Sequence, residues 1–181
     1  ADGLLLAILY YTGLRRGEAL GLRWSDIDFS ARTLRVERDI DFVTGKVGSV
    51  KTTTSVRTVP VPDELMALLN KARQVGSGYI IRAPKTGVFW SQATFVRRWR
   101  QIQAALLKAA PSIEKDGKGS ILTPHYFRHN YASILYRSGV DVLSAQLYLG
   151  HTDPATTMRI YTHLADETQM KDAEKVRKAF Q

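Results

Sequence analysis

The sequence has no cysteine among its 181 residues. Disulfide bonds, thiolate nucleophiles and zinc sites built on cysteine are therefore excluded. Long hydrophobic runs are also missing, since the longest, Leu4 to Tyr11, is far too short to span a bilayer. This run also lacks the charged start and the cleavage site of a signal peptide. With 44% hydrophobic and 24% charged residues, the composition indicates one globular domain with a substantial core.

Acidic residues are few: 17 Asp and Glu stand against 26 Lys and Arg, which gives a formal net charge of +9. This excess favours polyanionic partners such as nucleic acid, because each phosphate that is neutralised releases condensed counterions. Charge alone does not identify the partner. The sequence opens without Met and runs almost at once into an apolar segment, so we expect a fragment of a longer protein.

The periodicity predicts a mainly α domain with one small sheet (α+β). Leu4 to Tyr11 is apolar on every side, which indicates a buried helix that ends near Gly13. Alternation typical of strands, with a turn at Thr44-Gly45, predicts a three-stranded antiparallel sheet. Its expected strands are Thr33 to Phe42, Val47 to Lys51 and Val56 to Val61.

The other segments are predicted to be helical, because residues that favour helix starts precede apolar stripes. Expected helices begin at Arg15, Asp63, Ser91, Thr123-Pro124, Asp141, Asp153-Pro154 and Glu167. The last of these would form a C-terminal tail over residues 167–181. We expect residues 1–181 to form a single domain.

The helix after Pro124 carries the clearest polar face. At 100° per residue, His125, Arg128 and His129 fall on one side of it. Two imidazoles and a guanidinium group near a helix N-terminus suit an anion, although the same pattern also fits a solvated face. Two histidines four residues apart could also hold a metal, but the glutamate of a zinc-protease motif is missing because Tyr126 follows His125.

Five further residues have an ordinary interpretation when each is taken alone. Arg15 and Glu18 fit a charged helix start, and Lys51 beside a Thr-rich turn fits a solvated lysine. His151 fits a structural loop histidine, and Tyr161 fits a core aromatic. Their order and spacing along the chain are more informative than any one of them.

Four motifs in order resemble those of tyrosine-type site-specific recombinases. The first is TGLRRGEALGL, followed by WSDID, around Arg15, and the second is VKT at Lys51, ahead of RTVP. The third is the His-x-x-Arg of TPHYFRH at His125 and Arg128. The fourth is LGH, which ends at His151, together with IYTH around Tyr161. The resemblance covers about Leu4 to Leu164 and is closest to the integrases of phages and conjugative transposons. Phe127, Asn130 and Tyr148 depart from the residues that the family often has.

The resemblance implies the fold of a recombinase catalytic domain and a defined chemistry. Tyr161 would attack a phosphodiester of double-stranded DNA and form a 3′-phosphotyrosyl bond, while Arg15 and Arg128 clamp the phosphate. His125 would accept the tyrosine proton or orient it, His151 would donate to the phosphate, and Lys51 would protonate the leaving 5′-oxygen. Glu18 and His129 would support these groups.

The resemblance also implies the surroundings of the reaction. It requires neither a cofactor nor a metal. Expected partners are DNA and other protomers in a synaptic tetramer, with no membrane, in the cytoplasm of a bacterial cell or a phage-infected host. The family's N-terminal core-binding domain is expected to be absent from these residues, and the tail over residues 167–181 would dock within its own domain or on a neighbouring protomer.

Three alternatives remain open at this point. A type IB topoisomerase uses the same chemistry without exchanging two defined sites. Val140 to Leu164 can also be interpreted as a helix-turn-helix that binds DNA without catalysis. A metal-dependent nuclease is the third alternative.

Overall fold

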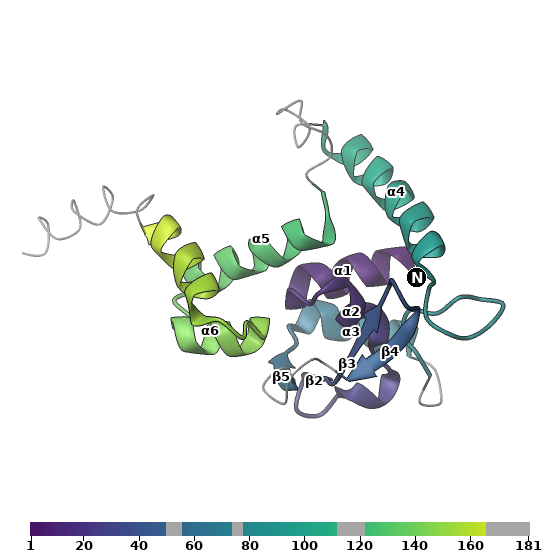
Figure 1. Cartoon of the computed structure of the whole chain (residues 1–181), viewed down its shortest axis with the longest axis horizontal. Coiled ribbons are helices and arrows are strands. Elements are labelled where there is room, and N and C mark those ends of the chain that lie inside the picture. Colours follow the sequence, from purple (N-terminus) through teal and green to yellow (C-terminus); the bar gives the residue numbers. More distant parts are fainter. Residues whose placement is uncertain (50–55, 74–77, 112–121, 166–181) are drawn as a thin grey trace, which may run out of the picture.

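The computed structural model describes residues 1–49, 56–73, 78–111 and 122–165, which form a mainly α-helical domain (Figure 1). Its helices are α1 (Asp2–Thr12), α2 (Arg16–Gly21), α3 (Asp63–Ala72), α4 (Gln92–Ala109), α5 (Pro124–Arg137), α6 (Val142–Leu149), a short 3-10 turn η1 (Trp24–Asp26), and a further helix over residues 154–165. Its strands are β1 (Ile27–Asp28), β2 (Thr33–Val36), β3 (Arg38–Asp41), β4 (Lys46–Ser49) and β5 (Arg57–Pro60). The described part contains no helix that is long and apolar enough to cross a membrane.

Two small antiparallel sheets take the place of the single sheet predicted from the sequence. A three-stranded sheet has the order β1-β2-β5, with Leu34 opposite both Ile27 and Val59, and β3 pairs with β4 in a separate hairpin. The mainly α class with a small three-stranded antiparallel sheet is confirmed, but the expected strand Thr33 to Phe42 divides between the two sheets.

The division follows from a close approach between β3 and α2. A Cβ atom on Gly17 would lie only 2.7 Å from the carbonyl oxygen of Ile40, so glycine is required at this contact. The Arg38 side chain donates to the carbonyl of Gly21, 3.3 Å away, and pairs with Asp26. These contacts hold β3 on α2, and β3 therefore does not extend the sheet of β2.

Most predicted helix ends are confirmed by their caps. Gly13 follows α1 with a positive φ of 61°, which an L residue rarely adopts. The side chains of Ser91, Thr123 and Asp141 each accept a backbone N–H of the helix that they begin. Capping is local in sequence, and this is why the patterns located these ends correctly. The predicted tail helix over residues 167–181 lies outside the described residues.

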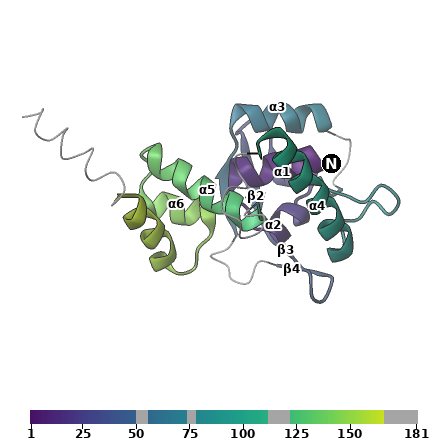
Figure 2. The same cartoon turned by 90° about the horizontal axis from the view of Figure 1, so that it is seen from above.

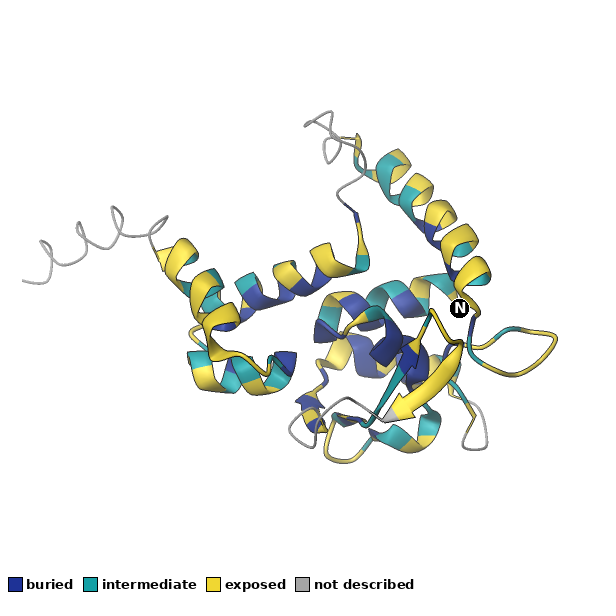
Figure 3. Cartoon of the chain, in the orientation of Figure 1, coloured by how far each residue is buried: buried dark blue, intermediate teal, exposed yellow. Residues whose placement is uncertain are grey.

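The core has two parts that meet along α5. The larger part includes Leu5, Ile8 and Leu9 of α1, all fully buried, although Tyr10 on the same helix is 40% exposed. The smaller part forms where α5 packs with α6 and the helix over residues 154–165. Figures 1 and 2 show these three helices to one side of α1 to α4, and Figure 3 shows the buried stripe of α5. The N-terminal half of α5 therefore lies at the junction between the two parts.

Candidate active site

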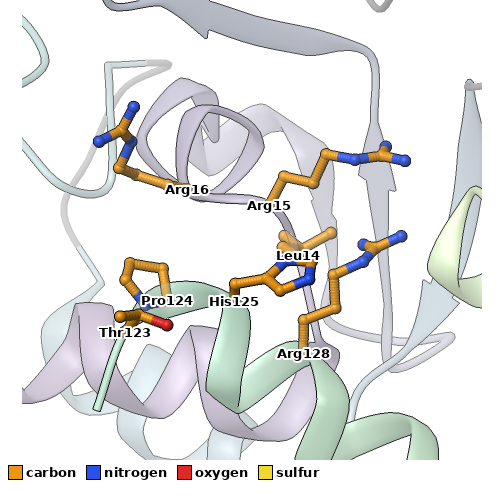
Figure 4. A pocket seen from close by; sticks show the side chains of 7 residues that line it. All are labelled: Leu14, Arg15, Arg16, Thr123, Pro124, His125 and Arg128. Carbon is orange, nitrogen blue, oxygen red and sulfur yellow. The ribbon is translucent and has the colours of Figure 1, made fainter. Parts of the chain in front are cut away.

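A pocket of about 350 Å³ lies at this junction, between the start of α2 and the start of α5. It is lined by Leu14, Arg15, Arg16, Thr123, Pro124, His125 and Arg128. Figure 4 shows the Arg15 and Arg128 side chains running in the same direction, with the His125 ring beside them, whereas Arg16 points the opposite way. Arg16 lies over the Phe42 ring at 4.0 Å. The pocket thus brings together three residues that the sequence predicted: Arg15, His125 and Arg128.

Arg15 is held by Glu18 at the first turn of α2. The Glu18 carboxylate accepts from the Arg15 backbone N–H at 2.8 Å and from Arg15 Nη1 at 3.0 Å. Arg15 Nη2 also donates to the carbonyl of Gly150 at 2.9 Å. Its side chain stays 42% exposed, while that of Glu18 is 1% exposed. These are the contacts that a supporting role for Glu18 requires.

Arg57 is the site residue that the sequence analysis missed. From β5 its guanidinium group forms a bidentate pair with Glu18, through Nη1 to Oε1 at 2.9 Å and Nη2 to Oε2 at 2.8 Å. Both side chains are almost completely buried. A signal was present in the sequence, because Arg57 stands in register with Val59 and Val61 on the inward face of an alternating strand. A charge at such a position needs a buried partner of opposite sign.

Arginines keep Glu18 ionised despite its burial. Burial by itself would raise the pKa of this carboxyl group, but the hydrogen bonds and charge of Arg57, together with the charge of Arg15, lower it to about 2. Glu18 is therefore an anion at neutral pH, and the arginine cluster retains one internal counter-charge.

Arg128 is buried in the floor of the site, with 4% of its surface exposed. It donates to the carbonyl of Gly13 at 3.0 Å and to that of Leu149 at 2.5 Å. Burial first, and then the nearby charge of Arg15, lower the pKa of Arg128 to about 9. The guanidinium group therefore still carries its charge at neutral pH.

The C-terminal end of α6 accepts hydrogen bonds from the guanidinium groups of three arginines. The carbonyls of Tyr148, Leu149 and Gly150 accept from Arg57, Arg128 and Arg15, respectively. The last carbonyls of a helix have no partner within the helix and carry partial negative charge, so they suit cations. Gly150 ends α6 with a positive φ of 64°. The chain then continues directly into His151.

His151 is fixed by the helix that follows it. Its Nδ1 atom lies 2.7 Å from the hydroxyl of Thr157, which is fully buried. Burial, with the charges of Arg128, Arg15 and Arg57, lowers the pKa of His151 to about 4. The ring is therefore neutral at physiological pH, and Nε2 is the nitrogen that it could offer to a ligand.

His125 and His129 lie one turn apart on the exposed side of α5, as the sequence predicted. Their rings meet edge to face with centroids 4.6 Å apart. Burial and the charges of His129 and Arg128 lower the pKa of His125. His129 is not among the residues that line the pocket. In the described ranges, no group of three or more His, Asp and Glu side chains is arranged to hold a metal ion.

Tyr161 lies in the smaller part of the core and does not line the pocket. Its hydroxyl donates to the carbonyl of Val140 at 3.2 Å, and its ring packs edge to face on Tyr136 at 5.1 Å between centroids. Burial and the charge of Asp141 raise the pKa of Tyr161. The structure thus does not bring Tyr161 together with Arg15 and Arg128. Lys51 lies outside the described residues.

Comparison with known proteins identifies the family. Residues 1–168 match the profile of the Phage integrase family. The chain belongs to the phage integrase family. The resemblance inferred from the four sequence motifs is therefore confirmed.

Several relatives of this integrase-family chain are known. It is 33% identical to a "Tyrosine recombinase XerC-like" protein of Caldanaerobacter subterraneus subsp. tengcongensis, over 97% of this chain and 49% of the relative. It is 29% identical to the "ICEBs1 integrase" of Bacillus subtilis, over 93% of this chain and 46% of the relative. The chain thus spans about half the length of the curated relatives that it matches.

Two solved structures, of a recombinase and of an integrase, are similar to the fold of this chain. The crystal structure of XerA recombinase has a TM-score of 0.68 at 27% identity, over 96% of this chain and 56% of that one. A structure of the Tn1549 transposon integrase in complex with transposon right end DNA has a TM-score of 0.73 at 20% identity, over 97% of this chain and 58% of that one. The recombinase catalytic-domain fold expected from the motifs is confirmed.

Proposed function

We propose that this chain is the catalytic domain of a site-specific recombinase, which cleaves and rejoins DNA strands through a 3′-phosphotyrosyl bond at Tyr161. The observation that carries the proposal is the convergence of Arg15 and Arg128 with His125 on one pocket (Figure 4). Membership in the phage integrase family and relatives named as tyrosine recombinases and integrases support it. The covalent bond conserves the energy of the broken phosphodiester, so rejoining needs no nucleotide cofactor.

Arg15 and Arg128 would stabilise the pentacoordinate transition state. Negative charge builds on the non-bridging oxygens during attack, and a guanidinium group offers paired N–H donors that match phosphate. Each of these arginines donates two hydrogen bonds from its Nη atoms to the protein, out of the five N–H donors of a guanidinium group. The remaining donors are available for the phosphate, and the protein contacts hold them in a fixed orientation.

Proton transfers would accompany the exchange of bonds at phosphorus. The bond from Tyr161 Oη to phosphorus forms while the bond from phosphorus to the 5′-oxygen breaks. His125 would accept the tyrosine proton, and Lys51 would protonate the leaving 5′-oxygen. His151 would donate from Nε2 to a non-bridging oxygen, because its Nδ1 lies against Thr157. His129 would support His125 through their ring contact.

Attack would first require release of the Tyr161 hydroxyl from Val140. One hydrogen bond of this kind contributes about 1 kcal/mol, which is small compared with the contacts that DNA would make. This hydrogen bond alone would therefore not prevent release of the Tyr161 hydroxyl when DNA binds.

Covalent trapping tests the proposal. This chain, without added metal, is mixed with nicked, end-labelled duplexes that carry candidate sites, and the products are separated on a denaturing gel. We expect a labelled protein–DNA band that persists in EDTA, is absent in Tyr161→Phe and remains in Tyr136→Phe, whose ring touches that of Tyr161. A band of equal strength in Tyr161→Phe would exclude Tyr161 as the nucleophile.

Other outcomes separate the alternatives. A band together with relaxation of supercoiled DNA, but without exchange between two defined sites, would indicate a type IB topoisomerase. Cleavage that EDTA abolishes would indicate a metal-dependent nuclease. DNA binding without any band, both here and in a chain extended to the length of the relatives, would indicate a non-catalytic DNA-binding domain.

The wider setting is also part of the proposal. DNA-bound structures of the Tn1549 integrase support double-stranded DNA as the partner. The covalent exchange of two sites would involve four protomers in a synaptic complex, and residues 167–181 would dock within their own domain or on a neighbouring protomer. We propose that a core-binding domain precedes residues 1–181 in the longer protein, which would act in the cytoplasm of a bacterial or phage-infected cell in the integration or excision of a mobile element.

A further inference from the structure

Arg57 connects two parts of the site from a strand that does not itself line the pocket. Its Nη atoms bind both carboxylate oxygens of Glu18, and its Nε atom donates to the carbonyl of Tyr148 at 2.8 Å. Glu18 in turn holds Arg15 through both its backbone and its side chain. The guanidinium group of Arg57 on β5 thus contacts both Glu18, which holds Arg15, and the last turn of α6.

The last turn of α6 carries the other half of the site. Tyr148 is followed by Leu149 and Gly150, whose carbonyls accept from Arg128 and Arg15, and then by His151. These groups are consecutive in the chain, so a shift of the Tyr148 carbonyl moves every one of them. Arg57 is therefore placed to set the spacing between α2 and the end of α6.

Close packing around Gly150 leaves Arg57 little freedom. A Cβ atom on Gly150 would lie 2.6 Å from Arg57 Nη1 and 2.7 Å from its Cζ. The guanidinium plane thus lies directly against the backbone of Gly150. A planar fork that binds a carboxylate with two nitrogens and a carbonyl with the third cannot be replaced by the single ammonium of lysine.

We propose that Arg57 is a positioning residue for the cleavage reaction: by holding the Glu18 carboxylate and the Tyr148 carbonyl together, it sets Arg15 and His151 at the spacing that the scissile phosphate requires. This inference rests on the proposed function. It assigns Arg57 no contact with DNA. Displacing a reacting or binding group by about 1 Å can cost about 100-fold in rate, so a positioning role predicts a large kinetic effect.

Arg57→Lys is the test variant, because it keeps the charge and loses the fork. Arg38→Lys is the matched control. Arg38 also pairs with a carboxylate (Asp26) and donates to the carbonyl of a helix residue (Gly21), but these contacts lie away from the pocket. Thermal unfolding identifies a temperature at which both variants are fully folded. The first-order rate of adduct formation on the nicked duplex and the Kd for the same duplex are then measured at that temperature.

We expect Arg57→Lys to lower the rate of adduct formation about 10- to 100-fold, the range found when residues that orient metal ligands are replaced, with a much smaller change in Kd. Arg38→Lys should lower the melting temperature and leave the rate of the folded protein unchanged. Glu18→Gln should also reduce the rate, and the double variant should lose less than the product of the two single losses, because both changes break the pair between Arg57 and Glu18.

The pH profile provides a readout that a purely structural role would not change. Glu18 faces Arg57 on β5, Arg15 at the start of α2, and the charge of Arg128 on α5. With the Arg57 fork removed, Glu18 should bind a proton at higher pH, so its titration, followed through the carboxyl carbon by NMR, should move upward in Arg57→Lys and not in Arg38→Lys. A rate for folded Arg57→Lys equal to that of the wild type, with an unchanged titration of Glu18, would overturn the inference.

A second readout separates this inference from the proposed function. If the wild type formed no adduct, the proposed function would fail, and the positioning role would be decided by the affinity of the pocket for inorganic phosphate, followed through the ring resonances of His125 and His151. Weaker phosphate binding in Arg57→Lys than in Arg38→Lys supports positioning of the anion site. Equal affinities in the two variants overturn it.

Discussion

The hydroxyl of Tyr161 donates a hydrogen bond to the main-chain carbonyl of Val140, 3.2 Å away. This contact directs the oxygen into the junction between α5 and α6 rather than toward Arg15 and Arg128. Tyr161, which would lose its proton in the proposed reaction, is thus held in an environment that favours the protonated form, because burial and the Asp141 carboxylate both raise its pKa. We expect this arrangement to protect the proposed nucleophile until DNA is bound.

The contribution of Asp141 to this protection can be tested separately from folding. Asp141→Asn removes the negative charge and keeps a side-chain oxygen that can cap α6 through the N–H groups of Leu143 and Ser144. We expect the pKa of Tyr161 to fall toward its ordinary value, with little change in stability. The measurement is a titration of the Tyr161 ring carbon by NMR, assigned by its absence in Tyr161→Phe. An unchanged pKa in Asp141→Asn would show that burial alone raises it.

The neutral state of His151 predicts a pH-dependent stability. Its folded pKa of about 4 lies below the unfolded value of 6.5, so the unfolded chain binds more protons between these values. The stabilisation is present above pH 6.5 and is lost as the pH falls from 6.5 to 4. Because the ring is only half-buried, we expect the loss between pH 7 and pH 5 to be about 1 kcal/mol after solvent screening.

Urea unfolding of the wild type and of His151→Gln at both pH values provides the measurement. Glutamine has no titration in this range, so the stability of the variant should fall less than that of the wild type by the expected amount. Parallel falls in the two proteins would show that His151 titrates near its ordinary value. His125 is present in both proteins, and its own titration therefore cancels in the comparison.

Local signals explain why much of the fold was predictable. Ser91, Thr123, Asp141 and Gly13 end or begin helices through contacts within four residues, which sequence patterns register directly. The division of the sheet was not predictable from alternation. It depends on the contact of Gly17 with the backbone of Ile40, which belongs to another element and is visible only in three dimensions.

The same distinction applies to the site. The motifs identified Arg15, His125 and Arg128, and the pocket brings these residues together. The pair of Glu18 and Arg57 joins residues 39 positions apart, and an arginine on a strand does not reveal which carboxylate it meets. The orientation of Tyr161 toward Val140 also results from packing between helices. The sequence motif could therefore single out Tyr161 but could not predict that its hydroxyl is bonded to a main-chain carbonyl.

Arg128 should be more important for the transition state than for binding. Lysine at this position cannot donate to the Gly13 and Leu149 carbonyls and still offer a fork to the phosphate. We expect Arg128→Lys to reduce the rate of adduct formation by about 100- to 1,000-fold, by analogy with loss of an oxyanion-hole donor, and to reduce DNA affinity far less. Arg35→Lys, an exposed arginine paired with Glu37, is the control and should change neither quantity appreciably.

The two assays together decide the role of Arg128. Gel-shift titrations give the Kd, and trapping on the nicked duplex gives the rate, both at a temperature where the variant is folded. Equal losses in rate and affinity would mean that Arg128 binds the ground state as strongly as the transition state, and its proposed role would then be wrong.

The glycine that ends α6 should be far less tolerant of substitution than a glycine of similar backbone conformation elsewhere. Gly150 and Gly45 have φ values of 64° and 66°, so alanine is strained to a similar extent at both positions. A Cβ atom at Gly45 meets nothing within 4 Å, whereas at Gly150 it would lie 2.6 Å from Arg57. Gly45→Ala should therefore cost only about 1 kcal/mol of unfolding free energy, the usual strain for a residue with positive φ.

Gly150→Ala should cost at least about 2 kcal/mol more than Gly45→Ala, because it also displaces a buried guanidinium group from Glu18. Chemical denaturation of the two variants and the wild type measures both costs in one experiment. The difference should shrink when Gly150→Ala is combined with Arg57→Met and Glu18→Gln, which remove the displaced pair. If the two single alanine variants were equally stable, Arg57 would have room to move away from α6, and its contact with Gly150 could not restrict the position of the guanidinium group.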